Sequence, residues 1–274
     1  MNYSYETLAE LVAASRKPCT NAANVQHLDN VSGRGFICAD RREVSTYSQA
    51  NAELSRPLFE AGAARVEKLA REIVAPTPQS IKRKLLKGAE GDELDMHRVW
   101  AGDLERAWTR ARRTRTVSVS RVLVCVYMSA NATVDSAVIA WRGVAGLALC
   151  EALEAAGYSV AVRAIVQCDL TDAKRTPYSL EVTAKHESEP LDLHKAANLL
   201  ASTLLFRGVV FQHLIAHAPL AISSGLGSDR PERATVDWAG FDHVALVTDA
   251  VRNAATASAW VSAQVAILDA RNGA

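Results

Sequence analysis

Two histidines stand four residues apart in the segment His213-Leu214-Ile215-Ala216-His217, the spacing with which helical zinc proteases hold their metal. Residues i and i+4 share one face of a helix, so both imidazoles would point the same way. Those proteases also need a glutamate directly after the first histidine, and Leu214 stands at that position. We therefore favour a packed or surface histidine pair over a metal site.

Signatures of phosphate binding and acyl transfer are missing from the sequence. The glycine-rich segment 223–228 lacks the Gly-Lys-Ser/Thr of a P-loop, and Asp229-Arg230-Pro231 interrupts any helix directly after it. Neither G-x-G-x-x-G nor G-x-S-x-G occurs. We therefore expect a protein that is not an enzyme, with no catalytic residue to name.

An arginine-rich stretch is the best nucleic-acid feature of the chain. Its candidate residues are Arg106, Arg110, Arg112, Arg113 and Arg115. A helix over 95–113 would place Arg106, Arg110 and Arg113 on one face beside Trp108, giving cations for phosphates and an indole for a stacked base. The alternative, which we favour, is that Trp108 belongs to the core and that the aliphatic parts of the arginine side chains pack around its edge.

The charge of the chain is balanced in total but divided along its length. The 31 Lys and Arg against 30 Asp and Glu give a net charge of +1. Residues 1–121 hold 20 and 15 of these and residues 122–274 hold 11 and 15, so the two parts carry +5 and −4. The total excludes nucleic-acid binding by charge on the whole molecule. It leaves open binding through the basic segment 82–121.

Composition and cysteine usage point to a globular protein of a reducing compartment. Hydrophobic residues make up 49% of the chain, enough to offset the entropy of ordering. The five cysteines include no C-x-x-C pair, so we expect neither a disulfide framework nor a structural zinc site. The N-terminus has no signal-peptide pattern, and no stretch reaches about 18 apolar residues. We expect a cytoplasmic protein with no membrane contact.

The first part of the chain reads as a mainly helical region over residues 1–114. Apolar spacing predicts helices over 4–16, 57–74 and 95–113, while residues 17–50 are rich in loop signals. Pro57 suits the first turn of the second helix, and Pro76 ends it.

The second part, residues 115–274, alternates apolar strands with helices. The predicted strands are 117–127, 158–167, 180–185 and 243–247, and the predicted helices are 135–157, 192–217 and 254–268. We expect the middle helix to break near Arg207-Gly208. This order predicts an α/β domain with helices on a mostly parallel sheet. Ligands of such sheets bind beyond the carboxyl ends of strands, here the loops 127–133 and 248–252.

These loops resemble those of a von Willebrand factor A (VWA) domain over about residues 116–270. In that family an apolar strand ends in a D-x-S-x-S loop, a helix and a strand pair follow with further helices, and a later strand ends in Asp. The matching segments here are Tyr127-Met128-Ser129-Ala130-Asn131 and Val244-Ala245-Leu246-Val247-Thr248-Asp249. The resemblance implies a VWA-like, Rossmann-type fold.

Metal-binding members of the family hold a divalent cation, often Mg²⁺, through these loops. By resemblance, Ser129 keeps the first hydroxyl, Asn131 replaces the second serine, and Asp249 matches the later aspartate. Tyr127 replaces the leading aspartate, which removes a main negative ligand. Ser223, Ser224 and Ser228 are the candidates to stand in for the family's threonine loop. Because Mg²⁺ gives up its water reluctantly, the resemblance implies a degenerate loop, and we expect no cofactor. Alternatively, the side chains of these residues cap helices and form hydrogen bonds with backbone groups.

Further segments resemble an uncharacterised group of phage- or prophage-encoded proteins with a VWA-like second half. They are Gly91-Asp92-Glu93-Leu94-Asp95 with Arg98 and Ala101-Gly102-Asp103, then Trp141-Arg142-Gly143-Val144-Ala145, and Glu151-Ala152-Leu153-Glu154-Ala155-Ala156-Gly157-Tyr158. This resemblance implies a host-cell cytoplasmic or virion setting.

The sequence as a whole favours a non-enzymatic interaction or scaffold protein. Its partner would be another protein or a further copy of itself. Two rival functions remain from other classes: nucleic-acid binding through residues 82–121, and metal-dependent hydrolysis at the loops above.

Overall fold

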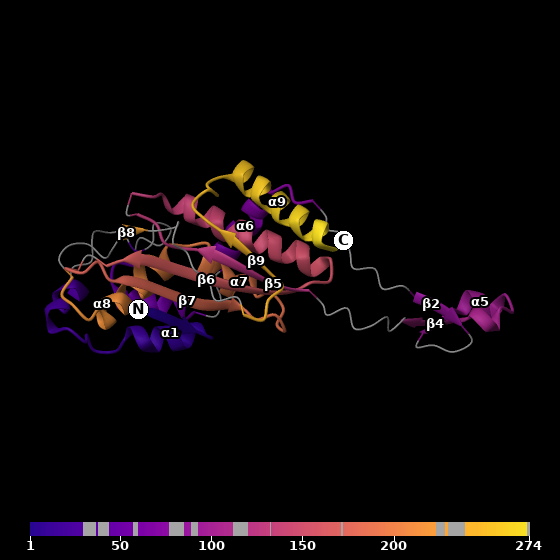
Figure 1. Cartoon of the computed structure of the whole chain (residues 1–274), viewed down its shortest axis with the longest axis horizontal. Helices are drawn as coiled ribbons and strands as arrows, with labels where there is room; N and C mark the ends of the chain where they lie inside the picture. The colour runs from indigo at the N-terminus through magenta and orange to yellow at the C-terminus, as the bar shows by residue number, and fades with distance from the viewer. Residues whose placement is uncertain are drawn as a thin grey trace.

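The computed structural model describes residues 1–29, 37, 44–56, 60–76, 85–88, 93–111, 120–131, 133–170, 172–222, 228–229 and 239–272. Figure 1 shows a main body built on a sheet with helices, and a smaller unit that stands apart from it. The predicted α/β fold class is confirmed at this level.

The main sheet is mixed, and most neighbours along it run parallel. Its order is β1 (Asn2–Tyr5), β7 (Pro177–Lys185), β6 (Ser159–Asp169), β5 (Arg121–Tyr127) and β9 (His243–Val247). The pairs β1–β7, β5–β6 and β5–β9 are parallel, whereas β6–β7 is antiparallel. The short strand β8 (Ser228–Asp229) also pairs with β6. The predicted strands are therefore present, and β1 adds a strand that the sequence reading placed in a helix.

Strand β5 is buried on both faces, as its continuous apolar run predicts. Val122, Val124 and Val126 point into the large core beneath the helices. Leu123 and Cys125 point to the other face, where they meet Ala161, Ile165 and partly buried Phe241. The sheet thus has one large apolar face, which needs helices to cover it, and a smaller cluster opposite.

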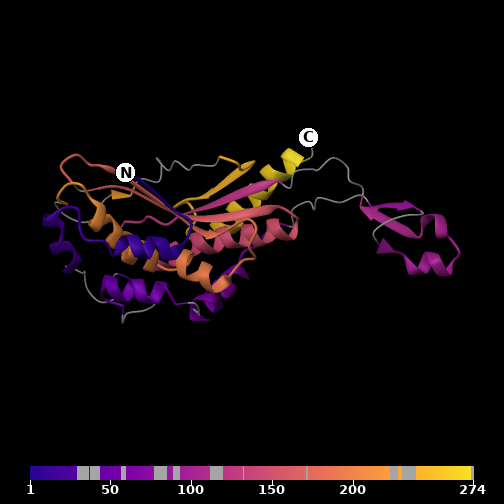
Figure 2. The same cartoon turned by 90° about the horizontal axis from the view of Figure 1, so that it is seen from below.

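The helices of the main body gather on one side of the sheet in Figure 2. The longest are α6 (Ser136–Ala155) and α9 (Ala254–Asn272), which pack on each other and on β9, while α4 (Glu60–Ala70) packs on α6. Asp135 caps α6 by accepting a hydrogen bond from the Ala137 amide, and Gly157 follows its end with a φ of 95°. Both boundaries agree with the sequence prediction.

Near the N-terminus the structure corrects the helix predicted over 4–16. Helix α1 (Leu8–Ser15) begins only after Thr7, whose side chain accepts from the Glu10 amide. Tyr3 and Tyr5 alternate with polar residues, and this period of two forms β1 rather than helix. The remaining short helices here are η1 (Ala22–Asn24), α2 (Gln26–Asp29) and α3 (Tyr47–Leu54). The core of the main body combines α1 and α3 with the later strands.

The long helix predicted over 192–217 consists of three pieces. They are α7 (Leu193–Leu200), the π-helical segment η3 (Leu204–Val210) and α8 (Phe211–His217). The break lies at residues 201–203 and not at Arg207-Gly208, because Ser202 bonds back to the Asn198 carbonyl and Thr203 donates to the Ile37 carbonyl. Gly208 stays within η3, where an added Cβ would lie 2.6 Å from Ala50.

The smaller unit replaces the helix predicted over 95–113, so that prediction is wrong. A three-stranded sheet, ordered β2 (Leu85–Gly88), β4 (Trp108–Ala111) and β3 (Glu93–Leu94), accompanies α5 (Met96–Trp100) and η2 (Leu104–Arg106). Helix α5 ends because Gly102 adopts a φ of 77°, and Asp103 then turns the chain. We call residues 85–88 and 93–111 the arm; Figures 1 and 2 show it apart from the main body.

Helix α6 is long and apolar enough to cross a membrane. Helix α7 and residues 204–217, which are bent by 69° relative to each other, also reach this length and hydropathy when they are taken together. About 61% of the apolar window of α6 is buried within the protein, against the sheet and neighbouring helices. The buried core helix of a globular protein can have the same length and apolar composition, so this finding is weak evidence for a membrane span. The expectation of no membrane contact stays a prediction.

Candidate functional site

At the carboxyl end of β5, the side chains proposed for a metal loop are engaged in internal hydrogen bonds. Tyr127 and Ser129 are fully buried. The Tyr127 hydroxyl donates to the Gln167 carbonyl at 3.1 Å, and the Ser129 Oγ accepts from the Gln167 amide at 2.8 Å. Both side chains therefore fasten the end of β5 to β6.

A buried arginine lies under the same loop. The Arg142 Nη1 donates to the Ser129 carbonyl at 2.7 Å and to the Tyr127 carbonyl at 3.3 Å, and the residue is 2% exposed. Its guanidinium therefore brings a fixed positive charge to backbone oxygens of the loop. Sequence reasoning missed this role, although an arginine within the apolar run of α6 was a visible signal.

The other two loop candidates lie toward solvent. Asn131 is exposed, and Asp249 is half-buried with an ion pair to Arg252 at 3.6 Å. Over the residues that the structure describes, no group of three or more His, Cys, Asp or Glu could hold a metal ion. Ser223 and Ser224 lie outside the described residues, and Ser228 belongs to β8.

The histidine pair is part of a packed aromatic cluster. His213 is fully buried, with Nε2 2.6 Å from the Tyr5 hydroxyl and Nδ1 2.8 Å from the Tyr178 hydroxyl. The His217 ring stacks on it with a centroid separation of 4.1 Å, and Tyr3 meets it edge-on. These contacts join β1, β7 and α8, so the pair is packed, as the sequence reading favoured.

Burial, together with smaller effects of the neighbouring His217 and Lys17, lowers the pKa of His213 to about 3. The imidazole is consequently neutral near pH 7 and can donate only one hydrogen bond. One tyrosine must then donate to it and the other accept from it. Burial also raises the pKa of Tyr178 well above its usual value and raises the pKa of Tyr5, so both hydroxyls remain protonated.

Of the nucleic-acid candidates, Arg106 is exposed in η2 and Arg110 lies in strand β4. The helical face expected to unite them does not form, because Trp108–Ala111 is a strand. Arg112, Arg113 and Arg115 fall outside the described residues. Trp108 is partly buried, in a strand that pairs with both β2 and β3.

The arm carries four exposed large hydrophobic side chains, which together we call the arm patch. It consists of Leu94, Met96, Trp100 and Leu104, whose exposed fractions are 38%, 46%, 76% and 62%. These are four of the seven large exposed hydrophobic side chains in the part of the chain that the structure describes. His97 meets Trp100 edge-on at 6.0 Å, and Arg98 is held by Asp103 at 2.9 Å. These polar side chains therefore lie beside the patch and leave it exposed.

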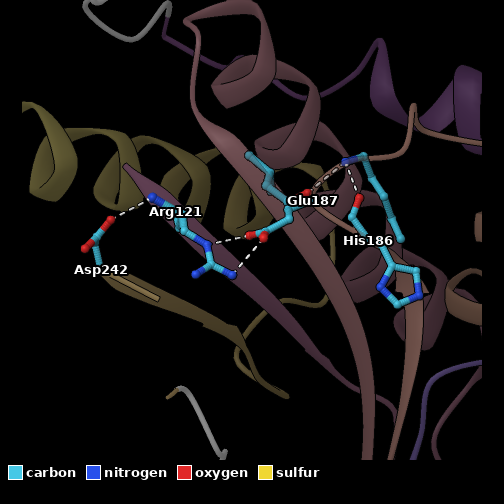
Figure 3. A network of polar contacts seen from close by, with 6 residues as sticks. Arg121, His186, Glu187 and Asp242 are labelled. Atoms are coloured by element: carbon cyan, nitrogen blue, oxygen red, sulfur yellow. Dashed lines mark hydrogen bonds and ion pairs between the residues drawn. The ribbon is translucent and has the colours of Figure 1, made fainter. Parts of the chain in front are cut away.

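Arg121 anchors the point where the chain re-enters the main body. Figure 3 shows its guanidinium facing the Glu187 carboxylate, with two hydrogen bonds of 2.7 Å, while Asp242 accepts from the Arg121 amide at 2.8 Å. Glu187 raises the pKa of Arg121 through the first of these contacts. The Phe241 ring lies 5.1 Å from the same guanidinium. The first described residues after the arm are thus fixed to the ends of β7 and β9.

A cavity of about 400 Å³ opens on the helical side of the main body. Its apolar walls are Val66 and Ala70 of α4, Leu147 and Ala148 of α6, Leu191 before α7, and Leu193 at the start of α7. Glu67, Arg71 and Glu151 also line it. We call this cavity the α4–α6 groove; its lining suits an apolar side chain bordered by charge. A second cavity of about 350 Å³ lies between the first turns of α1 and α7.

A family model described as Domain of unknown function (DUF7192) matches residues 42–251. This span runs from before α3 to the end of the Asp249 loop and includes the arm. No curated protein and no solved structure matches the chain.

Proposed function

We propose that this chain, which belongs to the family described as a domain of unknown function (DUF7192), is a non-enzymatic protein-interaction or scaffold protein. The observation that carries the proposal is the arm patch. Large apolar side chains exposed together in a small unit are costly in water unless a partner covers them, and Trp, Met and Arg are enriched at such interfaces. Trp100 is the most exposed of the four, at 76%.

We also propose that the main body is VWA-like. The support is the order of its elements: β5, then α6, the β6–β7 strand pair, α7 with α8, and β9 followed by Asp249. This is the order of strand, helix, strand pair, helices and Asp-ended strand that the family resemblance implies. A phage or virion setting rests on that resemblance alone.

A degenerate metal loop fits the same proposal. Tyr127 stands where the family has its leading aspartate, and its hydroxyl donates a hydrogen bond to the Gln167 carbonyl. The Ser129 hydroxyl is likewise occupied by the Gln167 amide. A loop whose oxygen atoms serve the sheet has fewer left for a cation, so we propose that the domain acts as a rigid support for its binding surfaces.

The proposal is tested by affinity purification of the full-length protein from its native cells, compared with a Trp100→Ser, Leu104→Ser variant. We expect the wild type to retain a protein, either another protein or untagged copies of itself, that the variant loses. The matched control is Val74→Ser, since Val74 is 77% exposed and lies outside the arm. A strictly monomeric wild type that retains no partner would contradict the proposal.

The two rival functions have direct tests of their own. Nucleic-acid binding predicts an affinity that falls steeply with salt and weakens in the triple variant of Arg110, Arg112 and Arg113. A metal-dependent hydrolase predicts bound Mg²⁺, Mn²⁺ or Zn²⁺ in elemental analysis of protein prepared with these metals present. Either result would replace the interaction proposal with an activity of that class.

A further inference from the structure

We infer that Tyr5 and His213 form an acid-sensitive latch, which holds β1 on the edge of the sheet and releases it when His213 takes up a proton. The latch joins an edge strand to helix α8, which lies 208 residues later in the chain. Such a device goes beyond the proposed interaction function and is independent of it.

Strand β1 is held more weakly than the other long-range elements of the sheet. It is four residues long and lies at one end of the sheet, next to β7. Asn2 and Ser4 are exposed, whereas Tyr3 and Tyr5 are half-buried. A strand this short buries little apolar surface, and edge elements open at a lower cost than central ones. The side chains of its two tyrosines must therefore supply much of what keeps β1 docked.

Both tyrosines of β1 pack on the ring of His213. The Tyr5 hydroxyl lies 2.6 Å from Nε2, and Tyr3 meets the ring edge-on with the centroids 4.7 Å apart. The Tyr178 hydroxyl of β7 lies 2.8 Å from Nδ1, and His217 stacks on the same ring. Strand β1 therefore covers the histidine and is also held by it.

The surroundings of His213 do not favour a positive charge on its ring. The titratable groups that face it come from β1, β7, α8 and the chain after α1; they are Tyr3, Tyr5, Tyr178, His217 and Lys17. Over the residues that the structure describes, no Asp or Glu forms an ion pair with His213. Burial, with the smaller effects of His217 and Lys17, lowers the pKa of His213 to about 3. The docked state thus excludes the proton.

Release of β1 changes this environment. It removes two of the rings that cover His213, so that water reaches the imidazole and its pKa returns toward the ordinary value of about 6.5. The released state then binds a proton that the docked state excludes. Its population relative to the docked state should therefore grow about tenfold for each pH unit as the pH falls from about 6.5 toward 3.

Release would also uncover the backbone of β7. The Ser179 amide donates to the Met1 carbonyl at 2.8 Å, and β1 pairs with β7 from Ser179 to Val182. Strand β7 itself stays in the sheet, because its other side pairs with β6. Unpaired N–H and C=O groups along a sheet edge can pair with a further strand. Acid would thus expose a sheet edge that β1 covers at neutral pH.

Hydrogen exchange of the full-length protein, followed by NMR from pH 6 to pH 4, tests the latch. The Ser179 amide reports release of β1, and the amides of the central strand β5 report global unfolding. After correction for the intrinsic pH dependence of exchange, the opening constant at Ser179 should rise about tenfold per pH unit. At each pH it should also exceed the opening constant of β5 by at least about tenfold, because the edge opens locally.

The variant His213→Gln separates the proton from the packing. Glutamine offers a donor and an acceptor to the two hydroxyls but does not titrate, so β1 should stay docked and the pH dependence at Ser179 should disappear. His243→Gln is the matched control and should keep it. His243 is also buried, at 9% exposed, and burial lowers its pKa too, but it lies in β9 at the opposite edge of the sheet.

A second variant, Tyr5→Phe, keeps the histidine and weakens the latch from the side of β1. Loss of this hydrogen bond should raise the opening constant at Ser179 about tenfold at pH 7, with the same dependence on pH below it. This variant decides the question if His213→Gln fails to fold.

Three outcomes would overturn the inference. They are an opening constant at Ser179 that does not change with pH, an equal rise in the His213→Gln protein, and equal opening constants at Ser179 and in β5. The last of these would show that the edge opens only when the whole protein unfolds. The proposed interaction function would stand in each case.

Discussion

At the scale of single residues, His213 shows how a polar group is accommodated in an apolar core. Its two ring nitrogens lie within hydrogen-bond distance of two tyrosine hydroxyls that come from different strands. A neutral imidazole satisfies both contacts only if one hydroxyl donates and the other accepts. Either tautomer of the ring meets this condition, with the roles of the two hydroxyls exchanged, but a second proton on the ring would remove the acceptor nitrogen.

Acid should destabilise the protein through this residue. An unfolded chain binds a proton at His213 below pH 6.5, whereas the folded protein keeps it neutral down to a pKa of about 3. The free energy of unfolding should therefore fall as the pH drops from about 6.5 toward 3, since the unfolded state binds more protons there. Urea unfolding of wild type and His213→Phe across this range measures the effect. The variant should start less stable at pH 7.5 but show a shallower pH dependence, and parallel curves would refute the argument.

Ser129 should act as a structural residue. Ser129→Ala leaves the buried Gln167 amide without its acceptor at 2.8 Å, which should cost about 1–3 kcal/mol in the free energy of unfolding. Asn131→Ala, at an exposed position two residues on, is the matched control and should change it by less than about 0.5 kcal/mol. Equal effects of the two substitutions in urea melts would argue against the structural role.

At the scale of elements, α6 approaches its neighbours closely through two glycines. A Cβ at Gly143 would collide with the Leu200 carbonyl at the end of α7, and one at Gly146 would lie 2.7 Å from Val126 of β5. Because neither glycine has a side chain, α6 comes close to the backbone of α7 and to the Val126 side chain of β5. This explains why α6 combines a long apolar run with small residues.

Gly143→Ala should be among the most damaging small substitutions in the chain. The colliding atom is backbone, so α6 and α7 must move apart, and we expect a loss of at least about 3 kcal/mol, the upper end of overpacking costs. Gly157→Ala is the control: its Cβ meets nothing within 4 Å, and only its φ of 95° is strained, at about 1–2 kcal/mol. Chemical denaturation of both variants should preserve this order, and a reversed order would exclude the close approach.

The sequence predicted the elements whose pattern is continuous. The apolar run of β5 and the capped, Gly-terminated α6 appear nearly where they were expected. The β6–β7 pair and β9 follow for the same reason, since each buries alternate or consecutive apolar residues. The VWA-like interpretation of this order stays a proposal.

Two elements escaped prediction because long-range pairing decided them. Strand β1 is only four residues long, and its partner β7 lies far along the chain. Trp108–Ala111 continues a helical apolar spacing, yet its pairing with β2 and β3 makes it a strand. For the candidate site, spacing identified the packed His213–His217 pair but could not reveal the tyrosines around it, which come from distant strands.

At the scale of the whole molecule, positive charge is concentrated around the arm rather than on it. Residues 77–119 carry a net charge of +4, whereas the arm itself holds four Lys or Arg and four Asp or Glu. If the protein binds nucleic acid through residues 82–121, its affinity should therefore fall steeply as the ionic strength rises. Fluorescence anisotropy of a labelled oligonucleotide over a salt series measures this effect, and an affinity that does not change with salt would argue against such binding.

The position of β1 has a consequence for how the protein is made. Asn2 pairs beside Ser179, so some 175 further residues must be synthesised after β1 before its partner exists. At about 5–20 residues per second, this wait lasts roughly ten seconds or more. During it Tyr3 and Tyr5 have neither β7 nor His213 to pack against. The nascent chain thus carries an unpaired, aromatic strand until β7 has been made, and this edge of the sheet can close only after that.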